Sequence, residues 1–190
     1  METTHNIAIP NKVFNAFGSL ALRVATPSTR VGEFVRIGVT AYDYTLTYSD
    51  TFILIHYAQP KPDGMGNMFE GFYRYLKKSE FAALPAGERG YHVFPGLEDL
   101  DGKTYVGPFQ HDLLRGSLLE SYLNHTHQSK TGSVRVDPFH LTRALKAISA
   151  ICSVDGTECM SLTVQDDYGP ILLVANSDAY LVRGLVMPRR

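Results

Sequence analysis

The sequence predicts an α+β protein built from two β-α-β-β-β repeats, with helices on one face of antiparallel sheets. A helix start that contains proline occurs twice, at Ile9-Pro10 and at Asp137-Pro138, 128 residues apart. Each start is followed by a helical apolar stripe and then by three β-rich runs separated by turn residues. Because two such half-units can bury each other's apolar faces, we expect them to fold together as one domain over residues 1–190.

The first repeat is predicted over residues 1–58. A short strand over residues 6–9 leads into a helix that opens at Pro10, where a missing backbone donor costs nothing. The helix has one apolar stripe, and Thr26-Pro27-Ser28 ends it. Three strands are then expected over residues 33–41, 44–48 and 51–57. The residues of the apolar stripe are Val13, Phe17, Leu20 and Val24.

The second repeat is predicted over residues 132–190 and has the same order of elements. Residues 133–137 alternate as a short strand does, and Asp137 is a good N-cap for a helix whose first residue is Pro138. Three strands follow over residues 159–166, 170–175 and 180–187, with turn-forming residues between them. The apolar stripe of this helix consists of Leu141, Leu145, Ile148 and Cys152.

Residues 59–131 form an insertion that is not repeated elsewhere in the chain. We expect a helix that places Phe69, Phe72, Tyr73, Leu76 and Phe81 on one face. A short hairpin is expected between residues 91–94 and 103–106, and a second helix over residues 112–123. The insertion is predicted to pack on or beside the sheet, either as an interaction surface or as a cover for a sheet edge.

Composition narrows the class of protein. Hydrophobic residues make up 44% and charged residues 19% of the 190, which is typical of an ordinary globular protein. The formal net charge of −1 excludes a protein that coats nucleic acid through total charge, so DNA contact needs a local basic surface. No apolar run reaches the about 20 residues that span a bilayer, and no secretory signal is visible. The two cysteines, Cys152 and Cys159, are interpreted as buried thiols in a reducing cytoplasm.

Motifs that carry chemistry are weak, so the sequence predicts no enzyme, no cofactor and no bound metal. His125-Thr126-His127 is a close histidine pair, but its neighbours offer no further zinc ligand. The acidic run Glu98-Asp99-Leu100-Asp101 lacks the ligand pattern of a calcium loop. The nucleophile elbow and both glycine-rich phosphate loops are absent. A small metal-dependent enzyme with a site in the insertion stays open as an alternative, using His92, His111, His125 or His127.

Each predicted helix also has a modestly basic polar face. Lys12, Asn15, Ser19 and Arg23 recur at helical spacing opposite the first apolar stripe. On the second helix, His140, Arg143 and Lys146 lie three residues apart. Most amphipathic helices have such a face because it is solvated, so this pattern alone does not separate a solvated surface from a phosphate-binding one.

The two repeats resemble those of the bacterial DNA polymerase III β subunit, the DNA sliding clamp family, as a single-domain variant with an insertion. The chain end is the most specific match, because family members close with a strand and a tail that contains Met-Pro. The resemblance covers residues 5–58 and 132–190. It is carried by Ile7-Ala8-Ile9-Pro10, Gly38-Val39-Thr40, Leu46-Thr47-Tyr48-Ser49-Asp50, Val134-Arg135-Val136, Pro170-Ile171-Leu172-Leu173, Tyr180-Leu181-Val182 and Val186-Met187-Pro188-Arg189.

The resemblance implies a processivity and recruitment platform for a DNA polymerase or other replication and repair proteins. Such a clamp encircles duplex DNA as a ring lined by helices whose cations contact phosphates without reading bases. The expected phosphate contacts are Lys12, Arg23, Arg143 and Lys146. The expected peptide-binding groove is formed by Val186, Met187 and Pro188. A family ring of six domains implies a homo-oligomer of six copies of this one-domain chain.

Three departures from the family pattern leave a second reading open. The chain has material for one clamp domain instead of three, the insertion has no counterpart, and Arg189 stands where an apolar residue is expected after the proline. A charge at that position conflicts with an apolar anchor in the groove. The alternative is a clamp-like monomer or dimer that binds a replication partner without encircling DNA.

Overall fold

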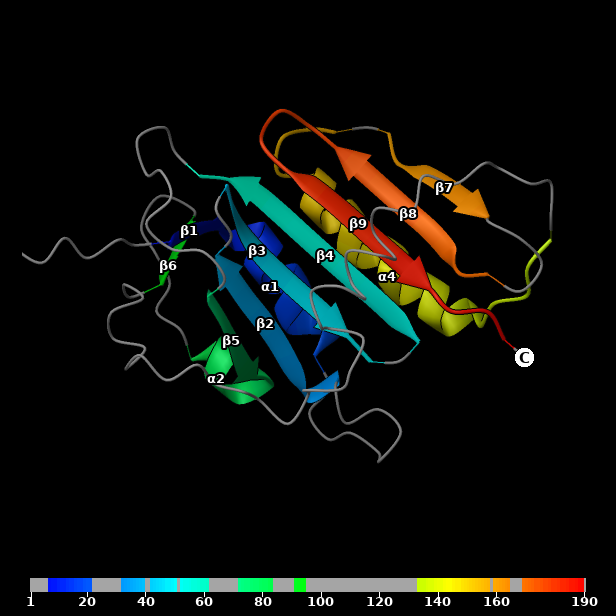
Figure 1. Ribbon diagram of the computed structural model, residues 1–190, viewed down its shortest axis with the longest axis horizontal. Helices are drawn as coiled ribbons and strands as arrows, with labels where there is room; N and C mark the ends of the chain where they lie inside the picture. Colours follow the sequence, from blue (N-terminus) through cyan, green and yellow to red (C-terminus); the bar gives the residue numbers. More distant parts are fainter. Residues whose placement is uncertain are drawn as a thin grey trace, which may run out of the picture.

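Two repeats join into one antiparallel sheet of seven strands in the order β5-β2-β3-β4-β9-β8-β7 (Figure 1). A separate two-stranded sheet pairs β1 with β6. The computed structural model describes residues 7–21, 32–39, 42–50, 52–61, 72–83, 91–94, 133–157, 159–164 and 169–189. The α+β class with helices on one face of antiparallel sheets is confirmed.

The first repeat follows its predicted order closely. Its elements are β1 (Ile7–Pro10), α1 (Asn11–Leu20), β2 (Phe34–Val39), β3 (Asp43–Ser49) and β4 (Ile53–Pro60). The predicted stripe residues Val13, Phe17 and Leu20 are buried in the core, and Val24 lies outside the described residues. The helix therefore forms where its apolar spacing predicts it.

The second repeat contains α4 (Pro138–Cys152), β7 (Ser161–Val164), β8 (Ile171–Asn176) and β9 (Leu181–Val186). The Asp137 carboxylate accepts the backbone N–H of Phe139 at 2.9 Å, which confirms the predicted helix start. The predicted strand over residues 133–137 is wrong. It makes a single bridge, between Val136 and Pro188, because its only described partner is the short tail after β9.

The buried face of α4 is broader than the predicted stripe. Ile148 and Cys152 are buried as expected, but Leu141 and Leu145 are only partly buried. Ala144, Ala147 and Ile151 are buried as well. The face is displaced because α4 packs against both the sheet and α1, and the small alanines permit the close approach.

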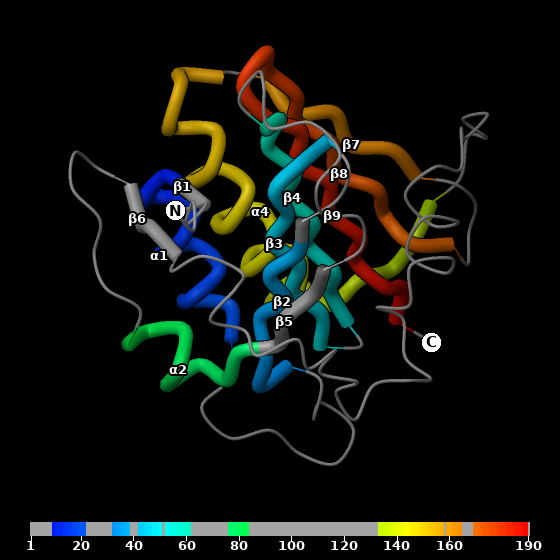
Figure 2. The backbone as a smooth tube through the Cα atoms, turned by 60° about the vertical axis from the view of Figure 1, so that its left-hand side comes forward, coloured from blue at the N-terminus to red at the C-terminus, as the bar shows by residue number. Residues whose placement is uncertain are grey.

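The two repeats meet where β4 pairs antiparallel with β9, from Ile53 opposite Val186 to Ala58 opposite Leu181. Helices α1 and α4 lie beside each other on the same side of the sheet (Figure 2). The third strands of the two repeats, β4 and β9, therefore lie next to each other in the sheet, and the two helices cover one shared core.

Within the described residues, none of the helices has the length and the apolar character that a membrane span requires.

The insertion contributes a strand where a helix was predicted. β5 (Phe72–Lys77) pairs along the whole of β2, and the short helix α2 (Lys78–Ala82) follows it. Pairing with the open edge of β2 outweighs the helical spacing of Phe72, Tyr73 and Leu76. Among the described residues of the predicted face, only Phe81 is helical, and its ring stacks on that of Phe14 in α1 with centroids 4.0 Å apart. The pairing of β5 fits the edge-covering interpretation of the insertion.

The first strand of the predicted hairpin, β6 (Tyr91–Phe94), forms as expected. It pairs with β1, so that a strand of the insertion meets the start of the chain. Pairing with residues 103–106 stays a prediction. The expected partner strand over residues 103–106, the expected helix over residues 112–123 and Phe69 lie outside the described residues.

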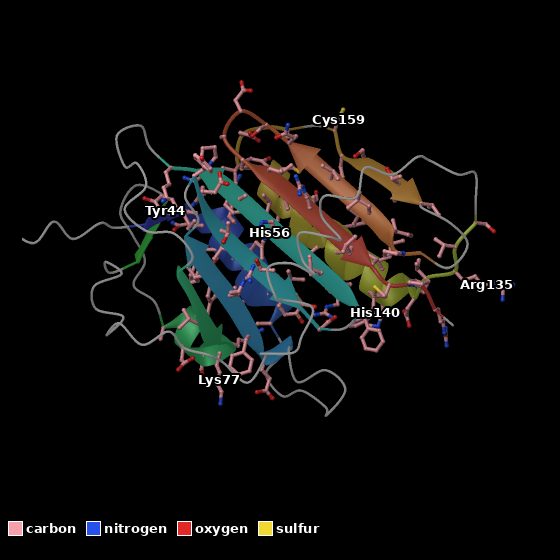
Figure 3. The ribbon with its side chains drawn as sticks, in the orientation of Figure 1. Tyr44, His56, Lys77, Arg135, His140 and Cys159 are labelled. Atoms are coloured by element: carbon pink, nitrogen blue, oxygen red, sulfur yellow. The ribbon has the colours of Figure 1, made fainter. Side chains whose placement is uncertain are left out.

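A polar row crosses the centre of the sheet on the face away from the helices. Arg36, Thr47, His56 and Arg183 are successive partners across β2, β3, β4 and β9, and Figure 3 places His56 in mid-sheet. The Thr47 hydroxyl lies 2.9 Å from His56 Nδ1 and accepts from Arg36 at 3.3 Å. Burial lowers the pKa of His56 to about 3, and the positive charges of Arg36 and Arg183 add to this effect. His56 is therefore neutral in the folded protein at physiological pH.

We expect His56 to make the folded state acid-sensitive. Its pKa is lower in the folded than in the unfolded chain, so below about pH 6.5 the unfolded chain binds the extra proton. Stability should fall as the pH drops from 6.5 toward 3, by about 1 kcal/mol between pH 7.5 and 5.5. Chemical denaturation of wild type and His56→Asn across this range measures the difference. An unchanged pH slope in the variant would refute the assignment.

Gly184 is expected to tolerate no side chain. A Cβ at this position in β9 would lie 2.8 Å from Ile148 Cδ1 and 3.1 Å from Ile55 Cδ1, both in the buried core. Gly184→Ala should therefore destabilise the fold by about 1–3 kcal/mol. Gly18→Ala is the control, because its Cβ meets Phe81 at an ordinary 3.6 Å. Since Gly18 lies inside α1, this change should stabilise by about 0.5–1 kcal/mol. Urea melts of both variants test the pair.

Candidate nucleic-acid and peptide interfaces

The outer faces of α1 and α4 carry two of the four residues that were predicted to contact phosphates, Lys12 and Lys146. Lys12 is exposed, and its ammonium donates to the Ser153 carbonyl at the end of α4 at 2.9 Å. Lys146 is exposed on α4, while Arg23 lies outside the described residues. The structure thus places Lys12 and Lys146 on the solvent side of two neighbouring helices.

Arg143 occupies a different environment from the two lysines. Its Nη1 donates to the Asp50 carboxylate at 2.7 Å, and the two side chains are 17% and 1% exposed. Its Nη2 donates to the Leu20 carbonyl at 2.9 Å and to the Tyr48 hydroxyl at 3.1 Å. The guanidinium therefore connects α4 to the end of α1 and to the β3–β4 turn. Contact of Arg143 with DNA remains a prediction, and its charge already has a partner.

Asp50 organises the turn that receives this arginine. One carboxylate oxygen accepts the backbone N–H groups of Phe52 and Ile53, at 3.1 and 3.0 Å. The other oxygen accepts the Tyr48 hydroxyl at 3.1 Å as well as the arginine. Burial raises the pKa of Tyr48, and the neighbouring carboxylate raises it further. The phenol therefore stays protonated and acts as a donor to Asp50.

The predicted peptide groove divides into a buried and an exposed part. Val186 is 0% exposed and belongs to the core, so its side chain is not accessible to a peptide. Met187 is 36% exposed, and its backbone N–H donates to the Phe52 carbonyl at 2.8 Å. Phe52 and Phe139 are also exposed, by 40% and 64%. We call the region formed by Phe52, Phe139, His140, Met187 and Pro188 the Met187 surface.

Aromatic contacts join Phe52, His140 and Phe139 within the Met187 surface. The His140 ring stacks on Phe52 with centroids 4.4 Å apart and meets Phe139 edge-on at 5.4 Å. The Arg143 guanidinium lies 5.5 Å from the Phe139 ring centroid. Sequence reasoning missed Phe52 and Phe139 as members of this region. The available signal was that Phe139 lies off the apolar stripe of its helix and that Phe52 lies in the turn just before β4.

Two arginines border the Met187 surface. The backbone N–H of Arg189 donates to the Arg135 carbonyl at 2.7 Å, beside the bridge between Val136 and Pro188. Both side chains are exposed. Figure 3 labels Arg135 and His140 on either side of the C-terminal segment. The arginine that departs from the family pattern therefore lies at the border of the apolar surface.

Most residues considered for metal or enzyme chemistry lie outside the part of the chain that the structure describes. Among the residues that the structure describes, no group of three or more His, Cys, Asp or Glu side chains is placed to hold a metal. His111, His125, His127 and the acidic run 98–101 lie outside those residues. Cys152 is buried as expected, but Cys159 is exposed, which corrects the expectation of two buried thiols. Cys159 precedes β7, which forms one edge of the seven-stranded sheet among the described residues.

Comparisons with known proteins identify the fold. No protein-family model matches the chain, and no curated protein matches it. Among solved structures, the DNA polymerase sliding clamp from Bacillus subtilis matches with a TM-score of 0.50 and 12% identity, over 100% of this chain and 65% of that one. The β subunit from the DNA polymerase of Streptococcus pyogenes matches with 0.45 and 14%, over 98% and 65%. PCNA of A. fulgidus, bound to the C-terminal region of FEN-1, matches with 0.45 and 10%, over 97% and 98%.

The chain has the fold of a sliding clamp. The Bacillus subtilis match carries this statement, since its TM-score reaches 0.50 over the whole chain. The chain spans about 65% of the length of the bacterial clamps that it matches. The expected resemblance to sliding clamps is therefore confirmed at the level of the fold, while DNA encirclement, ring formation and partners belong to the proposal below.

Removing the arginine of the Asp50–Arg143 pair should cost stability, because it leaves a buried carboxylate without its partner. Arg143→Met is expected to destabilise by about 3 kcal/mol. Arg143→Lys keeps the charge, but an ammonium cannot replace the two guanidinium nitrogens that bind Asp50, Leu20 and Tyr48. Most of the loss of stability should therefore remain. Lys146→Ala, on the same helix but exposed, is the control and should change stability by about 0.5 kcal/mol or less. If denaturant melts show that Arg143→Met loses no more stability than Lys146→Ala, a structural role for Arg143 is contradicted.

Proposed function

We propose that the protein is a DNA sliding-clamp-like scaffold without catalytic activity, which works on duplex DNA in the cytoplasm as a processivity or recruitment platform for replication or repair proteins. The observation that carries the proposal is the pair α1 and α4, packed side by side on one face of a sheet that both repeats share. The match to the Bacillus subtilis clamp over the whole chain supports the proposal at the level of the fold.

The outer faces of the two helices supply the proposed DNA contact. Lys12 and Lys146 are exposed on adjacent helices, and long flexible ammonium side chains bind phosphates as point charges without base readout. Arg23 and Arg143 complete the set expected from the resemblance. Few cations give weak contact with duplex DNA, which suits a protein that slides along it.

Ring formation is proposed to use the two edges of the seven-stranded sheet. β5 forms one edge and β7 the other, so the edges differ in sequence and in length. A contact between β5 of one copy and β7 of the next is heterologous and closes only if its rotation completes a ring. Homo-oligomerisation into a six-copy ring is the form that the resemblance implies.

A second candidate is a clamp-like monomer or dimer that binds a partner without encircling DNA. The observation that favours it is the pairing of β5 along all six residues of β2. The β2 edge of the first repeat is therefore paired within the chain, so another subunit cannot pair with β2. In both candidates the Met187 surface is the proposed docking site for the partner protein.

The oligomeric mass decides between the two candidates. A six-copy ring predicts a mass near six times 21.1 kDa by light scattering after size-exclusion chromatography. A ring should also remain on nicked circular DNA in high salt and slide off linear DNA of the same length. A mass of one or two chains with equal loss from both DNAs would overturn encirclement and leave the non-encircling candidate.

Lysine substitutions locate the DNA surface. The double variant Lys12→Ala with Lys146→Ala should weaken binding equally for different DNA sequences and reduce the slope of log affinity against log salt by about 2. Lys77→Ala is the matched control, because Lys77 is an exposed lysine at the far end of β5 (Figure 3). Equal effects of the control and the double variant would contradict a DNA surface on α1 and α4.

A further inference from the structure

The polar row at the centre of the sheet lies on the face that points away from α1 and α4, and the proposed clamp function does not use it. We propose that this row binds a small oxyanion, of which inorganic phosphate is the simplest probe. The residues proposed to bind it are Arg36, Thr45, His56 and Arg183. The inference goes beyond the proposed function, because the proposed DNA contact lies on the helices that cover the opposite face of the sheet.

Strand register brings these residues to one face of the sheet. The row across β2, β3, β4 and β9 consists of Arg36, Thr47, His56 and Arg183 (Figure 3). Thr45 precedes Thr47 by two residues on β3, so its side chain lies on the same face. The residues opposite Thr45 on the neighbouring strands are Gly38 and Ala58. Both are small, so neither of these two positions places a bulky side chain beside the row.

The row is rich in hydrogen-bond donors. Guanidinium groups only donate, and Arg36 Nη2 donates to Thr47 Oγ1 at 3.3 Å. The same oxygen lies 2.9 Å from His56 Nδ1, so the Thr47 hydroxyl proton is placed to be donated to this nitrogen. The neutral imidazole then carries its own proton on Nε2, which is a further donor. Donors that include two cations match the acceptor oxygens of an oxyanion.

The electrostatic field at the centre of the row is positive. Burial is the main cause of the low pKa of His56, and the charges of Arg36 and Arg183 lower this pKa further. Among the described strand residues, the carboxylate on this face is that of Asp43, at the start of β3. Asp43 keeps its charge, but the nearby Lys61 interacts with it and offsets it. The two arginines therefore determine the sign of the field at His56.

A buried hydroxyl is the second, independent sign of a ligand. Thr45 is 3% exposed, and its Oγ1 has no hydrogen-bond partner among the described residues. A buried hydroxyl in this state costs stability, and an oxyanion that accepts its proton removes the cost. His56 and Arg183 are only partly buried, so solvent reaches the row from the side of β4 and β9.

An NMR titration of the full chain with inorganic phosphate tests the inference. The ring signals of His56, assigned by their loss in His56→Asn, should shift with phosphate concentration until they saturate. Sodium chloride at the same ionic strength should cause no saturable shift. Thymidine monophosphate in place of phosphate separates a free ion from a phosphate ester. Because Thr45 is buried, we expect the ester to bind more weakly.

Variants connect the shift to the proposed residues. Thr45→Val keeps the shape of the side chain and should weaken phosphate binding about fivefold, since one donor is lost. Without phosphate the same variant should be at least as stable as the wild type, because it removes a buried hydroxyl that has no described partner. Arg183→Gln should weaken binding about tenfold. Thr163→Val on the edge strand β7 is the matched control and should leave binding unchanged.

Each other outcome would overturn the inference. The absence of a saturable shift would refute the oxyanion site. A saturable shift that is the same in Thr45→Val and Arg183→Gln would show an adventitious ion only. Thymidine monophosphate that binds as tightly as phosphate would refute a site for a small free ion. The oligomeric mass and the retention on circular DNA do not depend on any of these results, so they test the clamp separately.

Discussion

The ion pair between the buried Asp50 and the partly buried Arg143 holds together parts of the chain that are 93 residues apart. Asp50 belongs to the β3–β4 turn of the first repeat and Arg143 to the helix of the second, and the same guanidinium reaches the end of α1. Such a pair is not necessarily worth more than an apolar contact. It is directional, however, and a charge that loses its partner inside a protein is costly. The pair therefore fixes how α4 lies on the sheet.

Helix α4 connects the two surfaces on which the proposed function depends. Its first turn supplies Phe139 and His140 to the Met187 surface, its middle is held by Arg143, and Lys146 projects from its outer face. A helix packed on both α1 and the sheet is a rigid support, so the two surfaces keep a constant relative position. A scaffold that holds DNA on one side and a partner on another requires such a constant geometry.

Local patterns predicted most elements of the two repeats because those elements satisfy local rules. The apolar spacing of Val13, Phe17 and Leu20 and the Asp137-Pro138 start gave helices at the predicted places. The predictions failed where pairing with a strand distant in sequence decides whether a segment becomes a strand. Residues 72–77 have helical spacing but become a strand because the edge of β2 is available. The single bridge at Val136 shows the reverse case, in which an alternating run lacks a full partner.

The sequence by itself determined the elements of the first repeat and the helix and three following strands of the second, because periodicity, N-caps and turn residues act over a few positions of the chain. It also indicated the exposed lysines of the helices and the Met187-Pro188 tail. Only the tertiary structure decided that Arg143 faces Asp50, that Val186 is in the core while Phe52 and Phe139 are exposed beside Met187, and that Arg135 is opposite Arg189. These relations depend on which strands pair and in which register. Pairing and register are set by contacts between residues far apart in the sequence, so local sequence patterns do not predict them.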